Sequence, residues 1–62
     1  MGRYADAEPL LRRALEGREA AFGPTHRDTI ISVDNLGRLL TAMGKHAEAE
    51  PLLRRAAAGS EG

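Results

Sequence analysis

Few residues in this chain could carry out chemistry on a substrate. His26, Asp28 and Ser32 have the composition of a nucleophilic triad, in which a histidine activates a hydroxyl group. Their spacing places them in a loop and in the first turn of a helix, and a thin helical protein offers no enclosed pocket there. We therefore expect no catalytic residues, no enzymatic activity and no cofactor.

A metal site is equally poorly supported. His26 and His46 stand twenty residues apart, without a third ligand at metal-like spacing, and the chain has no cysteine. We expect His26 to bond to backbone at a helix start and His46 to occupy an aromatic position. The absence of cysteine fits a reducing compartment, so we expect a cytoplasmic location.

Two arginine pairs, Arg12-Arg13 and Arg54-Arg55, could in principle meet the phosphates of DNA. The chain carries nine basic and nine acidic residues, however, so no strong positive field attracts nucleic acid. The apolar runs are only a few residues long, far short of a membrane span, and no secretory signal follows the first residue. We expect neither nucleic-acid nor membrane binding.

The strongest feature of the sequence is an internal repeat. A shift of 42 positions pairs "MGRYADAEPLLRRA" with "MGKHAEAEPLLRRA", and thirteen of the twenty overlapping positions are identical. Repetition at this period is typical of arrays of stacked supersecondary units. The chain holds about one and a half copies, which predicts a single fragment over residues 1–62.

Apolar residues recur at steps of three and four, and good helix formers fill most of the chain, which predicts an all-α fold. We expect helices at about 3–21, 29–43 and 46–58, with a loop at 22–28 and fraying after residue 58. The Gly23-Pro24 pair ends the first helix, and Asp28 or Thr29 is expected to cap the second. The short link before the third helix predicts antiparallel packing.

Large and small apolar residues share the predicted packing faces. Gly37 and Ala49 are expected on facing stripes of the second and third helices, where a leucine would push the helices apart. The residues assigned to packing or self-association are Tyr4, Ala7, Leu11, Leu15, Phe22, Leu36, Gly37, Leu40, Ala49, Leu52, Leu53 and Ala56.

The segment from Ile30 to Ala58 resembles a tetratricopeptide repeat. The matching positions are Leu36, Gly37, Leu40, Gly44, Ala49 and Ala56. The repeat length of 42 residues resembles that of the kinesin light chain and nephrocystin-like subclass. The stretch "AEPLLRRALEGREAAFGPTHRDT" and the "DNLG" that follows it also resemble the sequences of that subclass. The resemblance implies antiparallel helix pairs of an α-solenoid, with a lone B helix followed by one complete A–B pair.

The resemblance also implies a scaffold that holds peptides or partner proteins in a concave groove lined by A helices. By position, that face here comprises Ile31, Asp34, Asn35, Arg38, Thr41 and Ala42. Asn35 can form hydrogen bonds with a peptide backbone, and Arg38 can form two parallel hydrogen bonds with a carboxylate. The alternative interpretation is that Asp34 and Arg38 only form an ion pair with each other on a solvent-exposed helix face.

An alternative is a structural module whose main partner is another copy of itself. A thin slab of 62 residues with two aromatic side chains buries little apolar surface. We therefore expect a homo-oligomer, dimeric or larger, in which the first and third helices stack on other copies or the first helix is exchanged between chains.

Overall fold

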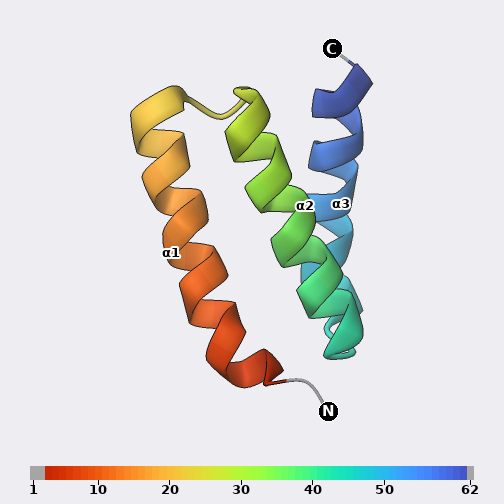
Figure 1. Cartoon of the computed structure of the whole chain (residues 1–62). Coiled ribbons are helices and arrows are strands. Elements are labelled where there is room, and N and C mark those ends of the chain that lie inside the picture. The colour runs from red at the N-terminus through yellow and green to blue at the C-terminus, as the bar shows by residue number, and fades with distance from the viewer. Residues whose placement is uncertain (1–2, 62) are drawn as a thin grey trace.

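The fold consists of three α-helices connected by short turns in antiparallel order (Figure 1). A computed structural model describes residues 3–61; Met1, Gly2 and Gly62 lie outside these residues. The helices are α1 (Tyr4–Phe22), α2 (Arg27–Ala42) and α3 (His46–Glu61), and residues 3–61 contain no strand. The predicted all-α fold is confirmed.

The junction between α1 and α2 differs from the expected one. Gly23 ends α1 with a φ of 92°, a conformation that glycine adopts without steric cost, and α2 begins at Arg27, two residues earlier than expected. The cap is His26, whose Nδ1 accepts a hydrogen bond of 3.0 Å from the backbone N–H of Asp28. The predicted bond from His26 to backbone is confirmed, whereas the predicted cap at Asp28 or Thr29 is wrong.

The junction between α2 and α3 is a tight turn around Gly44. Gly44 has a φ of 82°, and Lys45 N–H donates to Leu40 O over 2.8 Å, so the backbone reverses within three residues. At its far end α3 continues three residues beyond the expected end at Ala58. Gly59 allows this extension, because a Cβ there would lie only 2.5 Å from Ile30 Cδ1.

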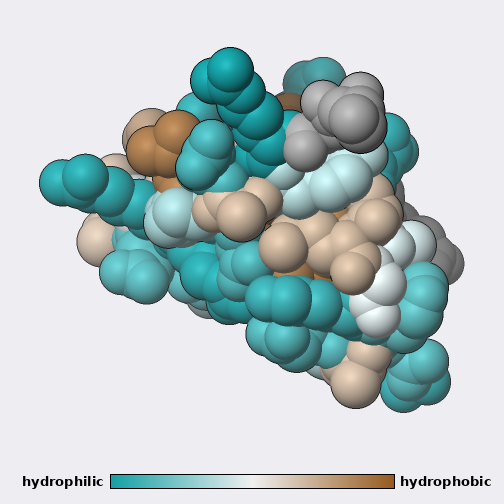
Figure 2. Space-filling view, turned by 90° about the horizontal axis from the view of Figure 1, so that it is seen from below, coloured by the Kyte–Doolittle hydropathy of each residue, from teal (hydrophilic) through white to brown (hydrophobic). Residues whose placement is uncertain are grey.

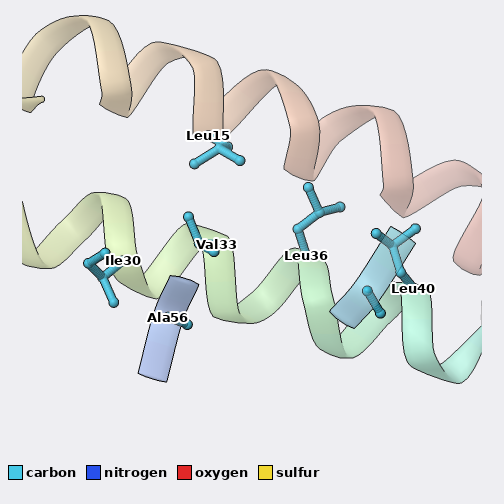
Figure 3. Packing of buried hydrophobic residues seen from close by; sticks show 7 residues of the cluster. Leu15, Ile30, Val33, Leu36, Leu40 and Ala56 are labelled. Carbon is cyan, nitrogen blue, oxygen red and sulfur yellow. The ribbon is translucent and has the colours of Figure 1, made fainter. Parts of the chain in front are cut away.

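The core lies along α2, which packs against α1 on one side and α3 on the other. Val33, Leu36 and Leu40 of α2 are almost completely buried. Figure 3 shows Leu15 of α1 pointing toward Val33 and Leu36. The neighbouring residue Ala14 is exposed, because Leu15 is the side chain that faces α2.

Near the middle of their contact, α2 and α3 approach closely at Gly37. A Cβ at this position would lie 2.7 Å from Cδ2 and 3.0 Å from Cγ of Leu53, well inside van der Waals contact. Glycine therefore sets the distance between these two helices, and Leu53 occupies the space that a side chain at 37 would need.

A group of four charged side chains joins α1 to the α2–α3 turn and to the first turn of α3. Glu8 accepts from Arg12 over 2.9 Å and from Lys45 over 3.1 Å, and Arg12 also reaches Glu48 over 3.1 Å. The hydrogen bond from Arg12, together with that from Lys45, holds the pKa of Glu8 below its usual value. The same carboxylate raises the pKa of Arg12.

We predict that Gly37→Leu destabilises the chain by about 1–3 kcal/mol, because the new side chain must displace Leu53 from a packed interface. Urea unfolding followed by circular dichroism, at one fixed chain concentration, measures the change. Gly17→Leu is the matched control. A Cβ at Gly17 has no neighbour within 4 Å among residues 3–61, so this change is expected to stabilise α1 by roughly 0.5–1 kcal/mol. Equal effects of the two substitutions would contradict this packing.

We predict that Glu8→Gln lowers the free energy of unfolding at neutral pH and that the difference from the wild type disappears in acid. The folded state holds the pKa of Glu8 below its ordinary value of 4.5. The carboxylate therefore contributes stability above that value, and the contribution is lost as the pH falls through the lower folded-state pKa.

Urea unfolding at several pH values, with and without added salt, measures this contribution. Salt is expected to reduce it, because the four charges are partly exposed. Glu16→Gln is the control, since Glu16 is exposed on α1 and forms no ion pair within residues 3–61. A pH dependence of the same size for both variants would show that the ion pairs of Glu8 do not matter.

Candidate partner-binding groove

A shallow groove runs between α2 and α3, and we call it the α2–α3 groove. One hollow, of about 300 Å³, is lined from α2 by Ile30, Ile31, Asp34 and Arg38 and from α3 by Leu53, Ala56 and Ala57. A second hollow, of about 440 Å³, is lined from α2 by Thr41 and from α3 by His46, Ala49, Glu50, Leu53, Arg54 and Ala57. The two hollows share Leu53 and Ala57, so they adjoin along α3, and the α2–α3 groove comprises both.

The helices position these side chains through their packing on the core. Because Val33, Leu36 and Leu40 of α2 are buried, the residues that line the groove project from an adjacent sector of the same helix. Thr41 Oγ1 donates to Gly37 O over 2.9 Å, which orients its methyl group and hydroxyl at the groove wall.

Each wall of the groove carries one exposed ion pair between residues four apart. Asp34 and Arg38 pair over 3.0 Å on α2, and Glu50 and Arg54 pair over 2.9 Å on α3. Such solvent-exposed pairs contribute only about 0–1 kcal/mol. Either guanidinium can therefore turn toward the carboxylate of a partner with little loss of fold stability.

The apolar part of the groove lies between these charges. Ile31 is about half exposed, and Leu53 and Ala57 line both hollows. The groove thus combines apolar side chains with charged groups on both helices, an arrangement that suits one amphipathic segment better than a small apolar ligand.

The structure brings together four of the six residues expected to bind a partner. Ile31, Asp34, Arg38 and Thr41 line the groove, whereas Asn35 and Ala42 are exposed on α2 beside it. The sequence interpretation assigned the binding face to α2 alone and missed the α3 wall, which contributes His46, Glu50, Arg54 and Ala57. The internal repeat held a signal for this wall, because the shift of 42 pairs Glu50 and Arg54 with Glu8 and Arg12, which bind across a helix interface.

The residues assigned to packing or self-association occupy different environments. Leu15, Leu36, Gly37, Leu40, Ala49 and Ala56 are buried, and Ala7, Leu11, Leu52 and Leu53 are half-buried. Tyr4 and Phe22 are exposed near the two ends of α1.

The histidines and Ser32 do not converge on a reactive site. His26 stacks on Phe22 with ring centroids 4.6 Å apart, and Ser32 is buried on α2. His46 is the first residue of α3 and lines the groove. Within residues 3–61, no three His, Cys, Asp or Glu side chains gather closely enough to hold a metal ion. None of the three helices, over the part described, is long and apolar enough to cross a membrane.

The family model described as tetratricopeptide repeat matches residues 1–61. No match is found among curated proteins or among solved structures. The match spans all three helices and both walls of the groove, and repeats of this family are in general non-catalytic scaffolds for protein–protein interaction. The chain therefore belongs to the tetratricopeptide repeat family.

Proposed function

We propose that the chain binds a peptide segment of a partner protein in the α2–α3 groove. The observation that carries this proposal is the convergence of Ile31, Asp34, Arg38 and Thr41 on one groove, opposite Leu53 and Ala57 of α3. Within the family, the 42-residue period supports placement in the kinesin light chain and nephrocystin-like subclass.

The chemistry of the α2 wall favours a ligand with a carboxylate next to an apolar side chain. Arg38 is three-quarters exposed and can form two parallel hydrogen bonds with a carboxylate. Ile31 supplies apolar contact one turn before Asp34 and two turns before Arg38. Asn35, beside the groove, can donate to and accept from the backbone of the bound segment.

We predict that the double substitution Arg38→Ala and Asn35→Ala lowers the affinity for groove-binding peptides by about tenfold to a hundredfold. The estimate follows from the loss of one hydrogen bond to a charged group, worth about 1.5–3 kcal/mol. Peptides are first selected on the full chain from a phage-displayed library of short random sequences, and their affinities are then measured by isothermal titration calorimetry.

The control for this experiment is Arg13→Ala. Arg13 is exposed on α1, away from the groove, so its loss removes a positive charge without changing either wall. If selected peptides bind the double variant as tightly as the wild type, α2 is not the binding wall and the proposal is wrong.

A second candidate function is self-assembly, favoured by a specific difference between α1 and α3. Ala49 and Ala56 of α3 are buried, whereas the corresponding residues of α1, Ala7 and Ala14, are half-buried and exposed. Leu10 on the same side of α1 is 66% exposed. Figure 2, which shows the molecule from below, also has apolar residues at the surface among hydrophilic ones. Within residues 3–61, the side of α1 that carries Leu10 and Ala14 is not covered by another helix.

We predict that the chain associates at high concentration and dissociates on dilution, and that Leu10→Glu shifts the equilibrium toward a single chain of 6.7 kDa. A charge in place of Leu10 opposes burial of this face. Light scattering over a dilution series measures the mass. Ala20→Glu is the control, since exposed Ala20 lies about 120° round the helix from Ala14. A compact single chain at every concentration would exclude self-assembly.

A further inference from the structure

The corner between α1 and α2 contains one side chain that contacts both helices. The ring of His26 stacks on Phe22 at the end of α1, with ring centroids 4.6 Å apart. The same ring caps α2, because its Nδ1 accepts a hydrogen bond of 3.0 Å from the backbone N–H of Asp28. The corner lies at the end of the molecule where α3 also ends (Figure 1). One imidazole therefore links the end of one helix to the start of the next.

A histidine cap differs chemically from the more common caps. Serine, threonine, asparagine and aspartate accept the same bond through an oxygen that remains an acceptor between pH 5 and 8. Imidazole is the side chain that ordinarily gains a proton within this range, and the protonated ring has N–H groups at both nitrogens and no acceptor. Protonation of His26 therefore sets one N–H against the N–H of Asp28 and abolishes the cap.

The charged groups around the ring come from all three helices, and they do not favour an additional positive charge. Each carboxylate at the corner is paired with an arginine, Asp28 with Arg18 over 3.8 Å and Glu19 with Arg55 over 2.6 Å. Arg27, next to the ring in the chain, adds a third positive charge. The partial positive charge at the start of α2 also disfavours a cation.

The aromatic partner of the ring acts in the opposite direction, because a cation is attracted to the face of Phe22. This attraction keeps the imidazole at its place in the corner, so the new N–H stays opposite the start of α2. The stack is thus compatible with both forms of the ring, whereas the cap requires the neutral form.

The first turn of α2 depends strongly on this cap. Its first helical hydrogen bond runs from Ile30 N–H to His26 O over 2.9 Å. Thr29, in the same turn, is completely buried, and its hydroxyl has no hydrogen-bond partner within residues 3–61. Such a buried hydroxyl already costs stability, and loss of the cap leaves a backbone N–H unpaired in the same turn.

The start of α2 also forms one end of the α2–α3 groove. Ile30 and Ile31 line the smaller hollow. Ile30 lies so close to α3 that a Cβ at Gly59 would approach its Cδ1 to 2.5 Å. Opening of the first turn of α2 therefore displaces apolar side chains from the groove.

We propose that His26 is a proton-sensitive joint. In its neutral form it caps α2, and on protonation it releases the first turn of α2 together with the groove end at Ile30 and Ile31. Mild acid then weakens partner binding while the core at Val33, Leu36 and Leu40 stays packed. The effect on α2 stands by itself, and the effect on binding rests on the proposed function.

The first test measures urea unfolding of the full chain at several pH values and one fixed concentration. Because the cap requires the neutral ring, stability is expected to fall with the pH. Between about pH 7.5 and pH 5.0 the ratio of folded to unfolded chain is expected to fall about fivefold, the effect of losing one cap. Ordinary carboxyl groups titrate below this range, and the chain has two histidines.

Two single substitutions assign the effect to one histidine. His26→Asn supplies a cap that does not titrate, so its folded-to-unfolded ratio is expected to change less than about twofold over the same range. His46→Asn is the matched control, since it removes the other histidine, which lies at the start of α3, and it is expected to retain the fivefold change.

Nuclear magnetic resonance of the full chain locates the change. The amide signals of Asp28 and Ile30 are expected to shift in step with protonation of the His26 ring, because their hydrogen bonds form the first turn of α2. The amide of Leu36, in the middle of the helix, is expected to stay unchanged.

The effect on binding is measured by isothermal titration calorimetry with a library-selected peptide that contains no histidine. Its affinity for the wild type is expected to fall about threefold between about pH 7.5 and pH 5.5, because a smaller fraction of the chain is competent to bind. The affinity for His26→Asn is expected to change by less than about 1.5-fold.

The proposal is overturned if the wild type and His26→Asn have the same pH dependence, if the pH dependence is lost with His46, or if the Asp28 amide does not respond to the ring. A pH-dependent first turn with unchanged peptide affinity overturns the regulation of the groove. If no peptide binds at neutral pH while stability and the Asp28 amide follow His26, the joint is supported and the proposed function alone is wrong.

Discussion

The arrangement of the three helices depends on the burial of one apolar stripe between two neighbours. Val33, Leu36 and Leu40 lie on α2, and α2 is the helix that packs closely against both α1 and α3. Long side chains also join α1 and α3, such as Arg55 to Glu19 over 2.6 Å. These contacts lie at the edges and cannot replace the central helix. The orientation of both outer helices therefore follows from the packing surface of α2.

Close packing around α2 also explains why the groove lies on one side. The Gly37 backbone lets Leu53 approach, so α2 and α3 touch over much of their length. Side chains next to this contact, such as Arg38 and Arg54, cannot enter the interface and line its margin. The binding surface is thus a consequence of how tightly the two helices meet, and its shape depends on a residue that a ligand would never touch.

The helix periods and the internal repeat were sufficient to predict the all-α fold, because apolar spacing and turn residues act locally. The α2 start and its cap were wrong, since Asp28 and His26 are both able to cap and only the geometry of the loop decides between them. The buried hydroxyl of Thr29 could not be predicted either, because it has no hydrogen-bond partner within residues 3–61 and its burial depends on the neighbouring helices. The α3 wall was missed because a repeat reveals equivalent residues without revealing which copy is covered.

The helix sequence shared by α1 and α3 packs on α2 in both copies, but through different sides, and this has a consequence for how such chains change length. A helix with the sequence "AEPLLRRA" packs on the helix before it through one side, as α3 packs on α2. It packs on the helix after it through another side, as α1 packs on α2. Duplication of a whole 42-residue segment would therefore create a junction made of contacts that already exist. Arrays of any length could arise by unequal recombination without a new interface having to evolve at each step.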